Sequence, residues 1–428
     1  MKKVIKKKAL PVVYEVSVRN YSKEGTIQAV TDDLERIASL GIDVIWLMPI
    51  YENAKKNKKG TLGSPYAIKN HKKIDGEYGT EEDLKDLIDT AHKHKIKVIM
   101  DMVFHHSSME SELVEEHPDW YLKDSRGNPT RKFQEWSDVY DFNYSATKDL
   151  WNYNIGVMEK WIEVGIDGFR CDIVTLMPME FWASVKEHFS KKTALIWIGE
   201  VFENSIIYNL REHGVAVSSA PEMHRVFDIT YDYDGFEYLK NYFKGKIYLK
   251  DFIDYLALQD RLYPFGAVKM RFLENHDQPR FAHIMRENME KIKNWTLFYL
   301  LLPGATLIHA GQEFGLTHHN DMFNSDPINW EKGNVDFYEF FKFNLKVIKE
   351  IKEKCTKFFI SEIAFGVVKI EWHGKREIYT AILNLEERFG DIDIDFELNG
   401  FEVSTHKRKT FKDFMFLQRE PILIKTEI

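Results

Sequence analysis

The chain has 428 residues, of which 44% are hydrophobic and 29% charged, a composition typical of a globular protein long enough for one large domain and a smaller one. Its formal net charge of -8 excludes a generally basic surface of the kind that recruits nucleic acid or anionic lipid. No apolar run approaches membrane-spanning length. From the charge and this absence we expect a neutral or polyhydroxylated partner, and neither nucleic acid nor a membrane. The oligomeric state stays open.

Short apolar runs alternate with longer amphipathic stretches along most of the chain. The 3.6-residue pattern predicts helices over residues 26–40, 81–95 and 148–164, the first ended by Gly41. Apolar strands that alternate with helices indicate a parallel sheet, and eight of them favour a closed (β/α)8 barrel, an α/β fold. The eight predicted strands cover residues 12–18, 44–47, 97–100, 168–170, 196–199, 226–229, 270–273 and 306–308.

Two regions depart from this alternation. Residues 107–142, after the third strand, lack helical periodicity and are unusually long for a loop, which indicates a functional insertion. After a last helix over residues 335–354, an alternating pattern through residue 428 predicts a C-terminal antiparallel β-sandwich. The predicted domains are therefore a barrel (residues 1–106 and 143–356), a short inserted domain (107–142) and a C-terminal domain (357–428).

The start of the chain and its cysteines bear on location. Five lysines lie within residues 2–8, but Pro11, Glu15 and Arg19 interrupt the apolar stretch that a secretory signal needs. The two cysteines, Cys171 and Cys355, are too few for a disulfide framework and fit a reducing compartment. We therefore expect a cytoplasmic protein.

Polar residues gather where the predicted strands end, and in a parallel barrel these ends meet at one mouth. Each residue taken alone is typical of a cap, an ion pair or a structural histidine, so the ordered set carries the interpretation. Hydrolysis of a glycosidic bond with retention needs a carboxylate nucleophile and a carboxylic acid that protonates the leaving oxygen, and three carboxylates are present. The set comprises Asp101, His106, Arg170, Asp172, Glu200, Asn275, His276 and Asp277.

This ordered set resembles the four signatures of the α-amylase family, glycoside hydrolase family thirteen, and in particular its intracellular amylase-like members. The similarity extends to residues 74–80 and 141–143 and so covers essentially the whole chain. It implies a barrel with a domain inserted after the third strand and a C-terminal β domain. The four matching segments are residues 101–106, 168–172, 198–201 and 272–277.

The resemblance implies a role for each of the three carboxylates. Asp172 would be the nucleophile, and Glu200 would act first as general acid and then as general base. Asp277 would bind hydroxyls of the reacting sugar and stabilise its oxocarbenium-like transition state.

Six further residues are implied to bind or position the substrate. His106 and His276 would hold sugar hydroxyls, and Tyr66 would stack on the apolar face of the sugar. The other three act beside them: Arg170 next to Asp172, Asp101 as a brace for Arg170, and Arg280 at the rim of the pocket.

One departure from the family pattern concerns metal binding. His105 stands where family members with a structural calcium usually have an asparagine, and neutral imidazole is a poor ligand for that oxygen-seeking ion. Thr175 and Leu176 stand where many α-amylases have a Lys-His pair that contributes to the sugar and calcium sites. We therefore expect no metal and no cofactor, with His105 in a structural role.

The leading hypothesis is a retaining glycoside hydrolase of carbohydrate metabolism that cleaves α-1,4 linkages in maltooligosaccharides or other α-glucans by double displacement. The alternative is an exo-acting α-glucosidase or oligo-1,6-glucosidase, because residues 276–280 resemble that branch. A glucanotransferase would differ only in the fate of the glycosyl-enzyme. A catalytically inactive scaffold is disfavoured, because such relatives lose one or more of the three carboxylates.

Overall fold

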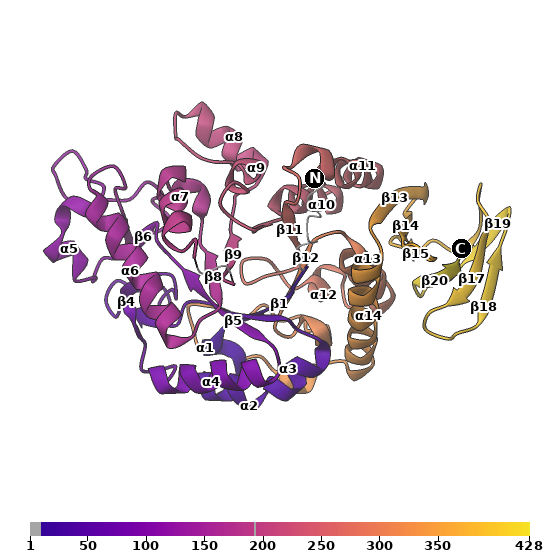
Figure 1. Ribbon diagram of the computed structural model, residues 1–428, viewed down its shortest axis with the longest axis horizontal. Helices are drawn as coiled ribbons and strands as arrows, with labels where there is room; N and C mark the ends of the chain where they lie inside the picture. The colour runs from indigo at the N-terminus through magenta and orange to yellow at the C-terminus, as the bar shows by residue number, and fades with distance from the viewer. Residues whose placement is uncertain (1–9, 192–193) are drawn as a thin grey trace. The chain divides into compact units, whose positions relative to one another are not determined.

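Eight parallel strands close into a barrel, which confirms the predicted fold class (Figure 1). The computed structural model describes residues 10–191 and 194–428, so the lysine cluster within residues 2–8 lies outside the described residues. Around the barrel each strand is followed by the next barrel strand in the chain. The strands are β1 (Val12–Val16), β2 (Val44–Leu47), β5 (Lys97–Met102), β8 (Gly168–Cys171), β9 (Ile196–Gly199), β10 (Ile229–Tyr231), β11 (Val268–Arg271) and β12 (Ala305–His309).

The described chain forms two compact units, and the barrel strands are divided between them. Residues 11–231 and 319–329 form the first unit, which contains β1 to β10. Residues 232–318 and 330–428 make up the second, which contains β11, β12 and the C-terminal strands. Each unit is described by itself below.

The strand register of the first unit positions its functional side chains. Asp101 on β5 pairs with Arg170 on β8, and Cys171 on β8 pairs with Gly199 on β9. Asp172 and Glu200 are the residues that directly follow this last pair. The register therefore sets these two carboxyl groups side by side at the carboxyl ends of neighbouring strands.

The sixth barrel strand begins later than predicted. We expected residues 226–229, whereas β10 covers Ile229–Tyr231. Val226 and Phe227 are buried although they precede the strand, and the ring of Phe227 packs at 5.0 Å from that of Trp182 in helix α7 (Met179–His188). The apolar run therefore reflects the packing of a loop against a helix.

Side-chain caps begin the main helices of the first unit. Thr26 accepts a hydrogen bond from the N–H of Ala29, and Thr80 forms a capping box with Asp83. The predicted helix over residues 26–40 is divided in two at Asp33, whose φ and ψ of -99° and 4° leave the helical range. The helices are α1 (Val18–Tyr21), α2 (Ile27–Asp32), α3 (Leu34–Leu40), α4 (Glu81–Lys93), α5 (Leu113–Glu116), α6 (Lys148–Val164), α7 (Met179–His188), α8 (Asn204–Glu212) and α9 (Ala220–Met223), with 3-10 turns at Pro118–Trp120 and Val174–Leu176.

The segment inserted after β5 is tied together at its two ends. Strand β6 (His106–Ser108) pairs antiparallel with β7 (Val139–Asp141), so that His106 lies opposite Asp141. Trp120 and Tyr121 are buried between these ends and form a small aromatic core. A second short ribbon, β3 (Tyr51–Asn53) with β4 (Ile68–Ile74), brings Tyr66 near this segment.

The second unit combines helices with two antiparallel sheets. Its helices are α10 (Tyr233–Phe243), α11 (Leu249–Leu262), α12 (Phe281–Ile284), α13 (Met289–Leu301) and α14 (Val335–Lys354), with 3-10 turns at Gln312–Phe314 and Trp330–Lys332. The larger sheet has the strand order β13-β14-β15-β20-β17-β18, and β16 pairs with β19 in the smaller one (Figure 1). These strands cover Lys357–Ala364, Val367–His373, Glu377–Asn384, Gly390–Asp393, Leu398–Glu402, Arg408–Phe411, Phe414–Leu417 and Ile422–Glu427, numbered β13 to β20.

The two C-terminal sheets share one apolar core. Ile392 of β16 and Met415 of β19 pack in one cluster with Val367, Ile382 and Ile424 from the larger sheet. The tail is thus a sandwich, as predicted.

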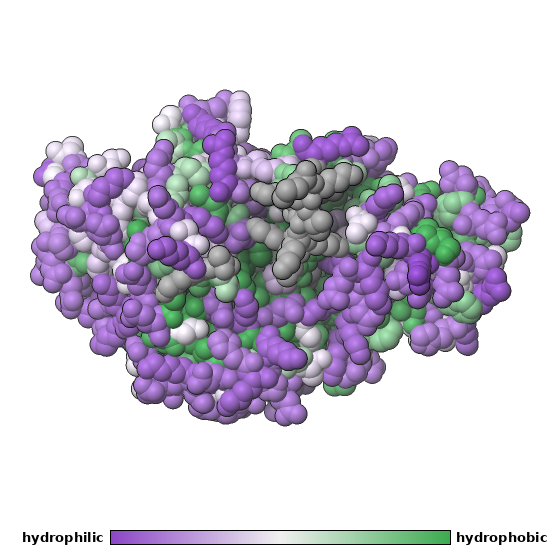
Figure 2. Space-filling view, viewed as in Figure 1, coloured by the Kyte–Doolittle hydropathy of each residue, from purple (hydrophilic) through white to green (hydrophobic). Residues whose placement is uncertain are grey.

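The face of the molecule drawn in Figure 2 is mainly polar. Figure 2 shows hydrophilic residues over most of the visible face, with apolar residues in smaller areas between them. None of the helices within residues 10–191 and 194–428 combines the length and apolar character needed to cross a lipid bilayer.

Candidate active site

A buried arginine organises the carboxylates of the first unit. Nη1 of Arg170 donates hydrogen bonds to both oxygens of Asp101, at 2.9 and 3.0 Å, and to Oδ1 of Asp172 at 2.7 Å. Nη2 lies 2.8 Å from Oε2 of Glu200, as an ion pair in which the N–H bonds do not point at the oxygen. We call these four residues the Arg170 cluster; they hold three carboxyl groups around one guanidinium.

Arg170 is kept charged although it is fully buried. Burial acts to lower the pKa of Arg170, but the carboxylates of Asp101 and Glu200 outweigh it, so that this pKa is raised well above its usual value. The guanidinium carbon lies 4.9 Å from the ring centre of Trp46 and 5.5 Å from that of Tyr231. Carboxylates and aromatic rings together fix the position of this cation.

Glu200 is held by the backbone that follows Asp172. Its Oε2 accepts a hydrogen bond from the N–H of Ile173 at 3.1 Å, and its own carbonyl accepts one from Val174. Ile173 has φ of 34°, in the left-handed region that a β-branched residue rarely adopts. Such strain is typical of functional sites, and here it turns the N–H of Ile173 toward the carboxyl group.

Tyr66 lies between Asp101 and His106 and contacts both. The hydroxyl of Tyr66 donates to Oδ2 of Asp101 at 3.1 Å, and Nε2 of His106 lies 3.2 Å from the Tyr66 carbonyl. The hydroxyl of Tyr51 donates to the Asp101 carbonyl at 2.7 Å. Asp101 is fully buried and serves as the common support for Arg170 and Tyr66.

The remaining predicted site residues belong to the second unit. Asp277 has a half-exposed side chain, and its Oδ2 lies 3.2 Å from Nε2 of the buried His276. The Asp277 N–H donates to Oδ1 of Asn275, which fixes the turn after β11. Within this unit, the half-exposed side chain of Asp277 is therefore held by two buried residues, His276 and Asn275.

Arg280 is held in the interior of its own unit. Its Nη1 forms an ion pair with Oε1 of Glu274 at 2.8 Å, and its Nε donates to the His318 carbonyl at 3.1 Å. The side chain is fully buried. This placement favours an indirect role, in which Arg280 fixes the loop after β11, over direct contact with a sugar.

A second buried charge cluster in the same unit is balanced. Lys269 lies 2.6 Å from Oδ1 of Asp234, and Arg271 pairs with Asp232. We call these four residues the Asp232 cluster. Gln259, Tyr255 and Tyr263 donate further hydrogen bonds to its two aspartates. Two acids face two bases, as expected of a structural network.

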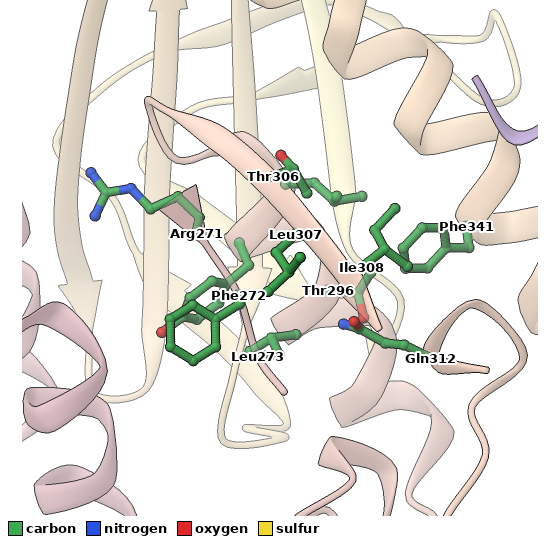
Figure 3. Close-up of a pocket in the computed structure, with 11 residues that line it drawn as sticks. Arg271, Phe272, Leu273, Thr296, Thr306, Leu307, Ile308, Gln312 and Phe341 are labelled. Carbon is green, nitrogen blue, oxygen red and sulfur yellow. The ribbon is translucent and has the colours of Figure 1, made fainter. Parts of the chain in front are cut away.

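The cavity near this cluster is too small for a ligand. It has a volume of about 10 Å³, room for at most one water molecule, and lies between β11, β12 and helices α13 and α14 (Figure 3). Figure 3 shows the guanidinium of Arg271 directed away from the apolar side chains that line it. This cavity is therefore not a candidate active site.

One group of side chains could hold a metal ion. His105, His106 and Asp141 each offer a ligand atom, and these atoms lie within 4.8 Å of one another. Burial lowers the pKa of His105 well below its usual value and also lowers that of His106, so both rings are neutral at pH 7. Two imidazole nitrogens and one carboxylate do not fit calcium, which takes six to eight oxygen ligands.

Sequence reasoning did not single out several of these residues. Trp46, Tyr51 and Tyr231 surround Arg170 or Asp101 but read as core residues of strands. Asp141 was recognised only as part of a family motif, and Ile173 gave no signal of its left-handed backbone. Each acts through a contact that only the fold creates.

Comparison with known proteins identifies the family and agrees with the fold. The α-amylase catalytic-domain model matches residues 12–354. An α-amylase from Lactobacillus plantarum is 34% identical and has a TM-score of 0.89, with coverage of 97% of this chain and 98% of that one. A noncanonic maltogenic α-amylase from Thermotoga neapolitana is 31% identical, with a TM-score of 0.86 and coverage of 98% and 99%.

Curated relatives are more distant and longer. A probable oligo-1,6-glucosidase 3 from Bacillus subtilis is 28% identical over 387 residues, which are 74% of this chain and 67% of that protein. The chain spans about two thirds or less of the length of such curated relatives. The family model and the two solved structures nonetheless cover most of the chain, which therefore belongs to the α-amylase family of glycoside hydrolases.

Proposed function

We propose that this chain hydrolyses α-1,4 linkages in maltooligosaccharides or other α-glucans with retention of the anomeric configuration. The observation that supports this most is that one guanidinium contacts both Asp172 and Glu200, at 2.7 and 2.8 Å. Two carboxyl groups on the two nitrogens of one arginine are close neighbours. We expect a separation of about 5–5.5 Å, which is the spacing that retention requires.

In the first step, Oδ2 of Asp172 attacks the anomeric carbon, because Oδ1 is held by Arg170. The bond from this carbon to the glycosidic oxygen breaks, and Glu200 gives its proton to the departing oxygen. In the second step Glu200 takes a proton from water, whose oxygen attacks the same carbon and releases Asp172. The enzyme returns to its starting protonation state.

The atom of Glu200 that carries the proton follows from its contacts. Oε2 accepts the N–H of Ile173 and lies beside Arg170, so the proton belongs on Oε1. Three carboxylates and one guanidinium would together carry a charge of -2, which a proton on Glu200 reduces to -1. The charge balance of the Arg170 cluster therefore suits a general acid.

Sugar contacts are assigned by the family resemblance. We propose that Asp277 stabilises the oxocarbenium-like transition state and that His106 and His276 hold hydroxyls of the same sugar. Tyr66, with its hydroxyl on Asp101, would present its ring to the sugar. Asp101 is proposed as a positioning residue for Arg170, and Arg280 as one for the loop that carries Asp277.

Domain boundaries and location are part of this proposal. The barrel would take residues 1–106 and 143–356, the inserted domain 107–142 and the C-terminal domain 357–428. Helix α14 ends at Lys354 and β13 begins at Lys357, which supports the last boundary. Cys171 and Cys355 are buried thiols that do not form a disulfide, which fits the cytoplasm.

The proposal is tested with purified protein and maltohexaose, beside isomaltose and panose, with products resolved over time by NMR. We expect α-configured maltose and maltotriose as first products. Early β-configured products would contradict retention. Glucose released from isomaltose or panose would favour the alternative function, that of an exo-acting α-glucosidase or oligo-1,6-glucosidase. Products longer than the substrate would indicate glucanotransfer. Absence of turnover on all three substrates would favour the hypothesis of a catalytically inactive scaffold.

A further inference from the structure

Three loops of the first unit are joined to one another through the ammonium group of Lys59. Its Nζ donates a hydrogen bond to the Glu135 carbonyl at 2.9 Å and lies 3.5 Å from Oδ1 of the buried Asp138. The same Nζ lies 5.9 Å from the ring centre of Phe323. We call these four residues the Lys59 junction. They come from the loop between β3 and β4, from the inserted segment and from residues 319–329.

Contacts with the backbone hold two of these loops together. Nη1 of Arg19 donates to the carbonyls of Gly63 and Met322, both at 2.7 Å. Gly60 has φ of 61°, and a Cβ at this position would lie 2.6 Å from the Phe323 carbonyl oxygen, so glycine is required for this close approach. The position of the Lys59 junction is therefore set by the fold.

The Lys59 junction adjoins His106, which we propose to hold a sugar hydroxyl. Burial is the main cause of the lowered pKa of His106, but the opposite charges of Asp138 and Lys59 also act on it. The ring of Trp136, which lies in the inserted segment between Glu135 and Asp138, has its centre 5.6 Å from that of His106. The junction is therefore next to the proposed sugar site.

This part of the site lies away from the general acid. Glu200 contacts Nη2 of Arg170, whereas Asp101 contacts Nη1 and accepts the hydroxyl of Tyr66. The Tyr66 carbonyl in turn contacts His106. A general acid stands beside the leaving group, so the opposite side receives the part of the substrate that ends in the nonreducing sugar.

We propose that the Lys59 junction closes the substrate cleft beyond the nonreducing end, so that α-glucans are cleaved from that end. The inference rests on the proposed function and adds to it the way in which the substrate binds. An ammonium has three N–H groups, and Glu135 and Asp138 face two of them, which leaves one for a hydroxyl of the terminal sugar. The partly exposed ring of Phe323 packs against the same sugar. Maltose and maltotriose, the expected first products, place that sugar two or three units from the cleaved bond.

The test compares maltoheptaose with the same oligosaccharide blocked by an ethylidene acetal across O4 and O6 of its nonreducing sugar. Initial rates give kcat/KM for each. We expect the wild type to hydrolyse the blocked form at least about 100-fold more slowly, because the acetal replaces hydroxyls that face the junction. Equal values of kcat/KM for the two forms would overturn the proposal.

Variants test whether the junction causes this difference. Lys59→Ala combined with Phe323→Ala should reduce the difference between the two forms to about tenfold or less. The matched control, Lys56→Ala, removes an exposed lysine of the same loop and should keep the wild-type ratio. Phe323→Ala alone is used if the double variant unfolds. A wild-type ratio in the junction variants would overturn the proposal.

Calorimetric titration separates the junction from the chemistry. Each oligosaccharide is titrated into the Asp172→Asn variant, which is expected to bind without turnover. The unblocked form should bind at least about tenfold more tightly. Equal affinities, or no binding of the unblocked form, would overturn the proposal. If the wild type hydrolyses neither form, the proposed function is contradicted, and the titration still decides whether the junction recognises the nonreducing end.

Discussion

The Arg170 cluster and the Asp232 cluster are built from the same kinds of buried side chain, but they differ in charge balance. Asp101, Asp172 and Glu200 share one guanidinium, whereas Asp232 and Asp234 face both Arg271 and Lys269. In the Asp232 cluster each carboxylate has a cationic partner, so this network has no excess carboxylate that could act as a nucleophile or an acid. The comparison teaches that an excess of carboxylate at the ends of barrel strands, rather than burial of charge as such, marks the proposed active site.

The largest expected effect separates the two clusters by activity. Asp172→Asn should lower kcat on maltohexaose by at least about 10⁴-fold, because it removes the proposed nucleophile. Its Tm should change little, since Asp101 still compensates Arg170. Initial rates and calorimetry measure both. A variant with near wild-type turnover would refute the role of Asp172.

The second effect separates the clusters by stability. Asp232→Asn removes one partner of a buried ion pair and should lower the free energy of unfolding by about 3 kcal/mol or more. Urea denaturation measures this, and kcat of the folded fraction should be retained. Replacement of both partners, with Asp232→Leu and Arg271→Met, should recover part of the loss. A large fall in kcat with unchanged stability would show that the Asp232 cluster serves catalysis and not stability.

Lys352, which lies near Arg271 of the Asp232 cluster, makes the stability of the protein depend on pH. Burial, assisted by Arg271, lowers the pKa of Lys352 from 10.5 to about 7. The unfolded chain therefore holds one more proton between pH 7 and about 10.5, and wild-type stability rises with pH in that window. Lys352→Met removes this slope.

Urea unfolding at pH 7 and pH 9.5 checks this prediction. The stability of the wild type relative to Lys352→Met should improve by roughly 3 kcal/mol at the higher pH. A parallel response of the two proteins would show that Lys352 stays charged in the folded state.

The smallest effects compare two tyrosine hydroxyls. Tyr66→Phe removes a hydrogen bond to Asp101 and should lower kcat by about fivefold, equal to about 1 kcal/mol, without a change in Tm. Tyr263→Phe removes one to Asp234 and should instead lower stability by about 1 kcal/mol. The same rate loss in both variants would indicate a general disturbance.

Most of the barrel could be predicted from the sequence because its strands are continuous apolar runs. Helices over residues 148–164 and 335–354 matched their predicted ends, which capping residues and chain breaks define. The sixth strand was misplaced because Phe227 is buried against Trp182 in a loop, and a buried loop gives the same apolar signal as a strand.

The site could be predicted only in part. Asp172 and Glu200 were found because they follow strands in a recognisable order. The aromatic surroundings of Arg170, the left-handed Ile173 and the approach of His105 to Asp141 arise from tertiary contacts. A sequence pattern records neighbours along the chain, and these contacts join residues from different strands.

The most direct test of the central claim is the capture of the covalent intermediate. The variant Glu200→Gln lacks the acid and base, and α-maltosyl fluoride carries a leaving group that needs no protonation, so a glycosyl-enzyme should accumulate. Proteolysis and mass spectrometry should then find a maltosyl group on the peptide that contains Asp172, and on that residue. Absence of any adduct, or an adduct on another carboxylate, would contradict the account.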